Sequence, residues 1–149
     1  MSIVAKRWAE ITADEFFDIV RLRTEVFFVE RRIDEPDFDD ADRDPATLHL
    51  WIADDRGCAA YLRVVELQSP DHGASRSFGR VAVRADRRGE GLARRLIAEV
   101  LERHGGETMI IHSQDYVTGL YADYGFEVAG ELYHEAGLPH RLMVRAPTA

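Results

Sequence analysis

The chain has 149 residues, with 27 acidic against 19 basic side chains, a formal net charge of −8 and a single cysteine. This length predicts one domain, residues 1–149, with a sizeable core. The acidic balance argues against nonspecific nucleic-acid binding, and the lone Cys58 excludes an internal disulfide and a multi-cysteine metal site.

No apolar run approaches the roughly 18 residues that a membrane-spanning helix needs. The N-terminus also lacks the charged and then apolar pattern of a secretory signal. We therefore expect a cytoplasmic protein with no membrane partner.

The first part of the chain predicts a short strand and a long helix. Residues 5–10 have the pattern of a strand. Thr12 and Glu15 form a capping box, which places the start of a helix at Ala13. Apolar residues then recur at helical spacing to about Glu30. The apolar face is wide, as expected of a helix packed on a sheet.

The most acidic segment, Asp34 to Asp44, predicts an irregular loop because it is flanked and interrupted by proline and has no periodicity. Its alternating aspartates resemble a calcium loop beginning at Asp40. An EF-hand requires glycine at position 6 and glutamate at position 12, where this chain has Pro45 and Trp51, so we exclude calcium. Two interpretations remain, a solvated acidic loop, which charge alone favours, or one wall of a site for a cationic amine.

The remainder of the chain predicts alternating strands and helices. Strands are predicted at residues 48–53, 58–66, 77–84, 108–112, 126–134 and 140–144, and helices at residues 91–104 and 116–124. Turns or loops are predicted at residues 54–57, 68–75 and 135–138. This order favours a mixed sheet covered by helices.

The stretch from Arg80 to Ile97 predicts a strand, a glycine-containing turn and a helix. Gly89 and Gly91 let the backbone curl tightly and a ligand approach it closely. The uncapped N–H groups and the dipole of the following helix attract anions. Seven arginines crowd into this region, which suits a small polyanion or, alternatively, a solvated helix face: Arg76, Arg80, Arg84, Arg87, Arg88, Arg94 and Arg95.

This turn is neither a P-loop, since no lysine stands near it, nor a dinucleotide fingerprint, since Arg94 occupies the third glycine position. Instead, Arg88-x-x-Gly91-x-Ala93 resembles the R/Q-x-x-G-x-G/A signature of the GNAT superfamily of acetyl-CoA-dependent N-acetyltransferases. About thirty residues later, Leu120-Tyr121-x-x-x-Gly125-Phe126 resembles the superfamily's second landmark, L-Y-x-x-x-G-F. Both motifs have the expected strand and helix context, so the resemblance covers nearly the whole chain.

A narrower likeness points to the ElaA-like branch of the superfamily. It rests on the acidic loop, on His49 and on three short motifs: Leu22-Arg23-x-x-Val26-Phe27-x-Val29-Glu30, Gly79-Arg80-Val81, and Tyr133-x-Glu135-x-Gly137-x-Pro139-His140.

The resemblance implies an α/β (α+β) fold, a mixed and mostly antiparallel sheet of about six to seven strands. A central parallel pair would be splayed, and about four helices would flank the sheet. It also implies acetyl-CoA as co-substrate without a metal, direct attack on the thioester by the primary amine of a small molecule or peptide, and homodimers as a common state. The acidic loop makes a cationic amine a reasonable acceptor.

The resemblance also assigns binding roles. Main-chain N–H groups of the turn would hold the pyrophosphate of CoA, and residues 81–83 would lie along the pantetheine arm as an added strand would. Gln114 stands where many relatives have an asparagine that contacts this arm. The 3′-phosphate would fall to Arg87, Arg94 or Arg95, among which the sequence does not choose. The implied cofactor-binding residues are Val81, Ala82, Val83, Arg88, Gly89, Glu90, Gly91, Leu92, Ala93 and Gln114.

The L-Y-x-x-x-G-F match selects Tyr121 as the general acid that protonates the departing thiolate. The alternative is core packing, because Val117, Tyr121 and Tyr124 share one helical face. No general base is assigned. The candidates are a water chain, the acidic loop, Glu30, Glu66, His112 and His140.

Two further functions compete with catalysis. One is a non-catalytic acyl-CoA sensor, which the presence of Tyr121 disfavours. The other is a phosphate-binding regulatory domain unrelated to CoA, which the co-occurrence of both motifs disfavours.

Overall fold

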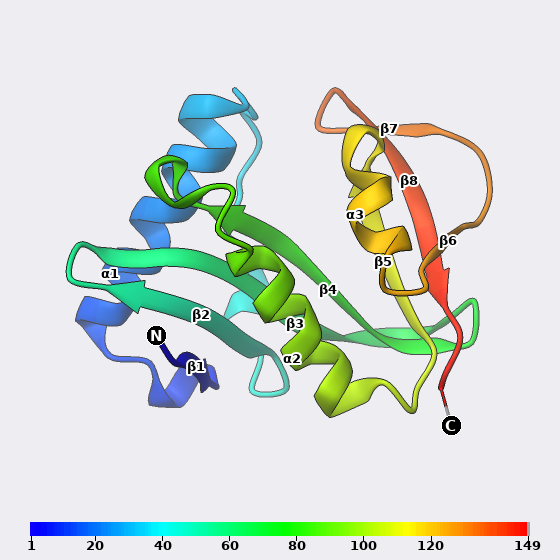
Figure 1. Ribbon diagram of the computed structural model, residues 1–149, viewed down its shortest axis with the longest axis horizontal. Coiled ribbons are helices and arrows are strands. Elements are labelled where there is room, and N and C mark those ends of the chain that lie inside the picture. Colours follow the sequence, from blue (N-terminus) through cyan, green and yellow to red (C-terminus); the bar gives the residue numbers. More distant parts are fainter. Residues whose placement is uncertain (149) are drawn as a thin grey trace.

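The computed structural model describes residues 1–148. Their strands form one sheet of eight strands (Figure 1). The strand order is β1-β2-β3-β4-β5-β8-β6, with β7 also paired to β8. The strands are β1 (Ile3–Lys6), β2 (Leu48–Asp54), β3 (Gly57–Asp71), β4 (Ala74–Val83), β5 (Met109–Gln114), β6 (Glu127–Val128), β7 (Tyr133–Glu135) and β8 (Leu138–Arg145).

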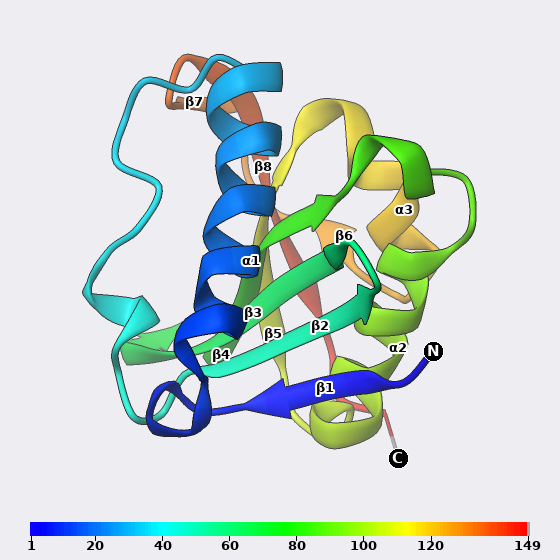
Figure 2. The same cartoon turned by 90° about the vertical axis from the view of Figure 1, so that its left-hand side faces the viewer.

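Helices cover both faces of the sheet (Figure 2). Helix α1 (Ala13–Arg23) packs on one face and continues as a π-helix over Thr24–Glu30. Helices α2 (Leu92–His104) and α3 (Thr118–Ala122) pack on the other face. The apolar stripe of α2 enters the larger core cluster with residues of β2 to β5, and α1 encloses a second cluster against β2 to β4. None of the helices within residues 1–148 is both long and apolar enough to cross a membrane.

Strands β4 and β5 form a parallel pair that soon separates. They share two rungs, Arg76 with Met109 and Ser77 with Ile110, whereas the other pairs of the sheet are antiparallel. Beyond Ile110 the two strands diverge, as Figure 1 shows. The predicted fold class, with its splayed parallel pair, is therefore confirmed.

Helix α1 begins at Ala13 with the predicted capping box, in which Thr12 accepts from the N–H of Glu15. The helical segment ends at Glu30 as predicted, although its last seven residues are π-helical. The described residues contain three α-helices rather than about four, because the π-helix prolongs α1 instead of forming a separate element.

Three predicted boundaries were wrong. The strand predicted at residues 5–10 is β1 followed by a 3-10 turn, Trp8–Glu10. The loop predicted at residues 68–75 is mostly strand, because β3 and β4 extend to a tight turn at His72 and Gly73. Irregular pairing between Glu66 and Asp71 makes Pro70 tolerable there. The strand predicted at residues 126–134 is divided into β6 and β7, which raises the strand count to eight.

Candidate functional site

The edge of β4 that faces the gap carries backbone groups that do not pair with a neighbouring strand. The N–H of Arg84 donates to the carbonyl of Ala59 at 2.8 Å, and Val83 stands opposite Ala60. Because successive residues of a strand turn their backbone groups to opposite sides, the N–H and C=O of Val83 point away from β3. They face the gap between β4 and β5.

A bulge in β4 starts this gap. Phe78 and Val81 both pack in the core beneath α2. They are three residues apart, whereas residues on the same face of a regular strand are an even number of residues apart. The pairing with β3 shifts between Tyr61 and Arg63, opposite this point. Arg80 has a φ of 53°, in the left-handed region that a non-glycine residue rarely adopts. The bulge turns the end of β4 away from β5.

The side chain of Arg80 holds the bulge. Its Nε and Nη2 donate to the carbonyl of Asp37 at 3.1 and 3.0 Å, and Nε lies 2.8 Å from the Asp37 carboxylate. A strained backbone conformation of this kind costs about 1–3 kcal/mol and persists only where neighbouring contacts enforce it. Asp37, in the acidic loop, supplies those contacts.

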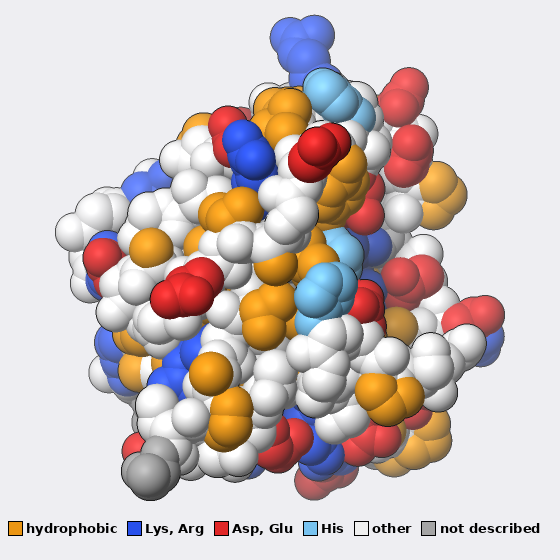
Figure 3. All heavy atoms as spheres, turned by 90° about the vertical axis from the view of Figure 1, so that its right-hand side faces the viewer, with side chains coloured by type: hydrophobic (Ala, Val, Ile, Leu, Met, Phe, Trp, Pro, Cys, Tyr) orange, Lys and Arg blue, Asp and Glu red, His pale blue; other side chains and the backbone are white. Residues whose placement is uncertain are grey.

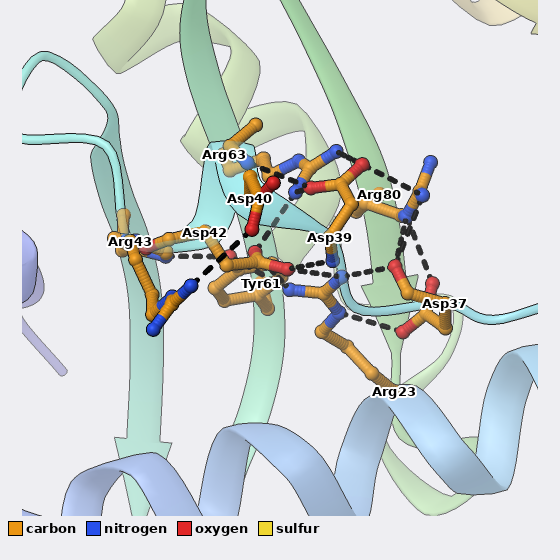
Figure 4. A network of polar contacts seen from close by, with 11 residues as sticks. Arg23, Asp37, Asp39, Asp40, Asp42, Arg43, Tyr61, Arg63 and Arg80 are labelled. Carbon is orange, nitrogen blue, oxygen red and sulfur yellow. Dashed lines mark hydrogen bonds and ion pairs between the residues drawn. The ribbon is translucent and has the colours of Figure 1, made fainter.

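The acidic loop is itself tied down by arginines (Figure 4). Arg23 lies 2.8 Å from Asp37 and 2.7 Å from Asp42, and Arg63 lies 2.7 Å from Asp39. Burial alone would raise the pKa of Asp42, which is 3% exposed, but its hydrogen bond with Arg23 lowers the pKa overall. The interpretation as a solvated loop was therefore wrong for Asp37 and Asp42, whereas Asp39 pairs with Arg63 while remaining exposed to solvent.

A neutral histidine completes this network. Burial lowers the pKa of His49, whose Nε2 lies 3.0 Å from the carbonyl of Asp42 and whose Nδ1 lies 2.7 Å from the Tyr61 hydroxyl. Since a carbonyl can only accept, Nε2–H donates to Asp42 and Nδ1 accepts from Tyr61. The backbone of the loop, like its carboxylates, is therefore held by hydrogen bonds to other elements.

The turn before α2 differs from the loop because no side chain of the described residues caps the N-terminus of the helix that follows. Gly89 and Gly91 have φ values of 80° and 78°, and Gly91 is the N-cap of α2 without any side-chain cap. A Cβ added at either glycine would meet no atom within 4 Å. Leu92 is buried and anchors the helix end. The turn is therefore an open cradle of N–H groups beneath a helix dipole, which suits a pyrophosphate.

Arg88 does not point into this cradle. Its Nε and Nη2 donate to the gap-facing carbonyl of Val83 at 3.2 and 3.0 Å, and its two Nη atoms pair with both carboxylate oxygens of Glu30. The pair with Arg88 lowers the pKa of Glu30. The turn is thereby joined to the end of the π-helix, across the mouth of the gap.

Six of the seven clustered arginines already have a carboxylate within 4 Å, and Arg95 is the exception among residues 1–148. Arg87 contacts Asp54 and Glu90, and Arg94 contacts Asp123. Within residues 1–148, the Arg95 guanidinium donates only to the carbonyl of Met1. Of the three candidates for the 3′-phosphate, Arg95 is thus the one without a competing anion.

Tyr121 lies in α3 with its ring packed against Phe78 and Phe126, at centroid distances of 6.0 and 6.3 Å. It is 7% exposed, and this burial raises its pKa to about 12. Its hydroxyl makes no hydrogen bond within the described residues, yet no buried polar atom there lacks a partner, so the hydroxyl reaches the surface. Core packing and proton donation are compatible, since the ring does the first and the protonated hydroxyl is available for the second.

The unassigned base candidates occupy different places. Glu66 pairs with Arg76, at the end where β4 and β5 still hold together. The base candidate His140, on β8, stands opposite Gln114, the predicted contact of the pantetheine arm, which is half-buried at the end of β5. His112 is exposed and bonds through Nδ1 to the hydroxyl of Tyr133.

Sequence reasoning missed two features of the site, the bulge at Arg80 with its contact to Asp37, and the partner of His112. The spacing of Phe78, Val81 and Val83 was a signal for the bulge, because apolar alternation breaks there. Asp37 and Tyr133 lie in segments that supported the ElaA-like likeness, but nothing in the sequence indicated their partners, since each meets its partner through the fold alone. No cluster of three or more His, Cys, Asp or Glu side chains suited to a metal occurs within residues 1–148.

Comparison with known proteins gives consistent matches. The family described as Acetyltransferase (GNAT) domain matches residues 42–146. A UPF0039 protein of Mycobacterium tuberculosis is 32% identical over 140 residues, which cover 93% of this chain and 89% of that protein. Protein ElaA of Escherichia coli is 29% identical over 143 residues, 92% and 91% of the two chains. The crystal structure of an acyl-CoA N-acyltransferase from Pseudomonas aeruginosa has a TM-score of 0.86 at 30% identity, covering 97% of this chain and 99% of that one.

Proposed function

The chain belongs to the GNAT acetyltransferase family, whose fold performs acyl transfer from acyl-CoA, and we propose that it moves the acetyl group of acetyl-CoA to a primary amine. Its membership confirms the resemblance drawn from the two motifs, and its similarity to ElaA confirms the narrower likeness. The observation that carries the proposal is the gap between β4 and β5, which opens directly beside the uncapped N-terminus of α2.

The residues of the turn before α2 and of the gap between β4 and β5 fit acetyl-CoA, the proposed acetyl donor. The N–H groups of residues 88–93 would hold the pyrophosphate, with Gly89 and Gly91 leaving the space that it needs. The edge of residues 81–83 that faces the gap would pair with the amides of the pantetheine arm, as in β-strand addition, and the ligand would compete with Arg88 for the carbonyl of Val83. Gln114 would offer its amide from β5, and Arg95 would take the 3′-phosphate.

Catalysis would combine three contributions. Holding both reactants in the gap removes the entropy of their encounter. A backbone N–H of residues 81–83 would stabilise the negative charge that develops on the carbonyl oxygen. Tyr121 would donate its proton to the sulfur, and its raised pKa keeps the phenol protonated over the whole neutral range.

Release of free thiol from acetyl-CoA, measured with a panel of primary amines, tests the proposal. We expect amine-dependent release that matches the amount of acetylated amine. Burial raises the pKa of Cys58 to about 12, so the native protein adds little thiol background. If CoA binds but no amine gives release above the rate of hydrolysis, the protein binds CoA without performing this transfer.

A further inference from the structure

His112 lies where the two parallel strands part. The last rung joins Ser77 to Ile110. Because parallel strands advance by about the same 3.3 Å per residue, His112 stands roughly level with Gly79, just before the bulge at Arg80. The backbone of His112 therefore stands beside the deep end of the gap, where the thioester of the proposed donor would end.

The ring lies on the opposite face of the sheet from Tyr121. Met109 and Ile111 enter the core beneath α2 and α3, so the alternation of β5 turns His112 and Gln114 to the face that carries α1. The side chain is exposed there. The flank formed by β5 to β8 carries histidine side chains beside apolar ones (Figure 3).

A hairpin fixes the orientation of the ring. Strands β7 and β8 are joined by a turn in which Ala136 and Gly137 have φ values of 52° and 76°, and this turn places the Tyr133 hydroxyl on Nδ1 of His112. Burial raises the pKa of Tyr133 to about 12, which keeps it a neutral phenol. When Nδ1–H donates to the phenol oxygen, Nε2 carries the lone pair, and Nε2 has no partner within the described residues.

The proposed acceptor requires a base. A primary alkylamine resembles a lysine side chain, with a pKa of about 10.4, so only about one molecule in 2,500 carries a free lone pair near pH 7. An imidazole nitrogen that carries a lone pair can accept that proton.

Resting on the proposed function, we infer that His112 is the general base of the transfer, with Tyr133 as the residue that positions it. His112 Nε2 takes one proton from the ammonium group and later passes it to solvent. The freed nitrogen forms a bond to the thioester carbon, and the C–S bond breaks. Tyr121 gives its proton to the sulfur and regains one from the attacking nitrogen, so that one proton is released overall.

The other side-chain candidates are engaged by partners of their own or lie away from the gap. Glu30 is paired with Arg88, and Glu66 lies at the closed end of the strand pair. His140 faces oxygen with both nitrogens, Leu138 O at 2.8 Å from Nδ1 and Glu135 at 3.5 Å from Nε2. The titratable groups known to face His112 are Tyr133 and, behind it, His140 and Glu135.

The test compares His112→Gln with the wild type by thiol release over a range of pH. We expect kcat/KM to fall by about 10²–10⁴ near pH 7, with part of the loss recovered at high pH, where the amine deprotonates in solution. Added imidazole should restore part of the rate. Tyr133→Phe should lower kcat to a lesser extent, and its kcat/KM should change with pH in the same way as that of the wild type.

His134→Gln is the matched control, an exposed histidine of the same hairpin without a contact to the gap. It should keep wild-type rates, and all variants should bind CoA as the wild type does in calorimetry. A His112→Gln enzyme with the rate and pH profile of the wild type would overturn the assignment alone. A wild type that releases no thiol with any amine would overturn the proposed function and this inference together.

Discussion

The acidic loop and the turn before α2 contain similar residues, arginines and carboxylates beside polar backbone, but they differ in how these groups are satisfied. In the loop, Asp37, Asp39 and Asp42 are matched by three arginines from three other elements. In the turn, arginines pair at the sides while the N–H groups around Gly91 remain uncapped. Satisfied charges hold a fold together, whereas unsatisfied donors in open space are available to a ligand.

The two regions also depend on each other. Asp37 holds Arg80, and Arg80 holds the bulge that opens the gap. The loop therefore serves the candidate site through geometry, although sequence reasoning considered it as a wall for a cationic amine. Changes in the loop should act on stability, and changes in the turn should act on binding.

The largest expected effect is on stability. Asp42→Asn leaves Arg23 and Arg63 buried with an incomplete counter-charge, and breaking such a pair costs about 3–5 kcal/mol. In a domain of this size that lowers Tm by roughly 10 °C, which calorimetry can measure. Asp40→Asn is the control, because that side chain is fully exposed and pairs only with Arg43. Equal melting of the two variants would show that the network does not stabilise the fold.

The same network predicts a pH dependence. The pKa of Asp42 is lower in the folded chain than its ordinary value of 3.8, so its stabilisation is complete above that value. It is lost as the pH falls through the lowered folded pKa. Melting of the wild type should therefore become more like that of Asp42→Asn only in strong acid. Convergence of the two already at pH 6 would contradict the assignment.

The next largest effect concerns Tyr121. Tyr121→Phe removes the proposed acid and keeps the ring in the core, so kcat should fall by about 10²–10³ while the affinity for CoA is unchanged. Tyr124→Phe is the matched control, since that hydroxyl donates to the carbonyl of Arg94 at 3.3 Å. Full turnover by Tyr121→Phe in the thiol-release assay would remove the general-acid assignment.

A smaller effect distinguishes the arginines. Arg95→Ala should weaken CoA binding about tenfold through the lost phosphate contact, and should leave dephospho-CoA, which lacks the 3′-phosphate, unaffected in calorimetry. Arg94→Ala, whose side chain is held by Asp123, should change neither affinity. An equal loss of affinity for CoA and for dephospho-CoA would show that Arg95 does not contact the 3′-phosphate.

The smallest effect should have the opposite sign. Glu30→Gln weakens the hold on Arg88 and so makes the carbonyl of Val83 more available. An exposed ion pair contributes about 0.2–1 kcal/mol, so CoA should bind up to about fivefold more tightly. Glu35→Gln, an exposed carboxylate elsewhere, should have no effect. Weaker binding to Glu30→Gln would mean that the pair supports the site instead of competing with the ligand.

The parts of the site that the sequence predicted are local. The glycines of the turn, the start of α2 and the placement of Tyr121 before Gly125 depend on residues a few positions apart, so motifs record them. The bulge depends on a contact between Arg80 and Asp37, 43 residues apart. The π-helical end of α1 and the division into β6 and β7 were likewise not predicted, because propensity and periodicity do not distinguish them from a continuous helix and a continuous strand.

Calorimetric titration of CoA into the wild type, Gly91→Trp and Gly73→Trp most directly tests the claim that the turn and gap form the donor site. Both glycines have a positive φ and open space for a side chain, so both variants carry similar backbone strain. We expect Gly73→Trp to bind CoA as the wild type does and Gly91→Trp to lose measurable binding. Equal binding by Gly91→Trp and the wild type would contradict the assignment of the donor site.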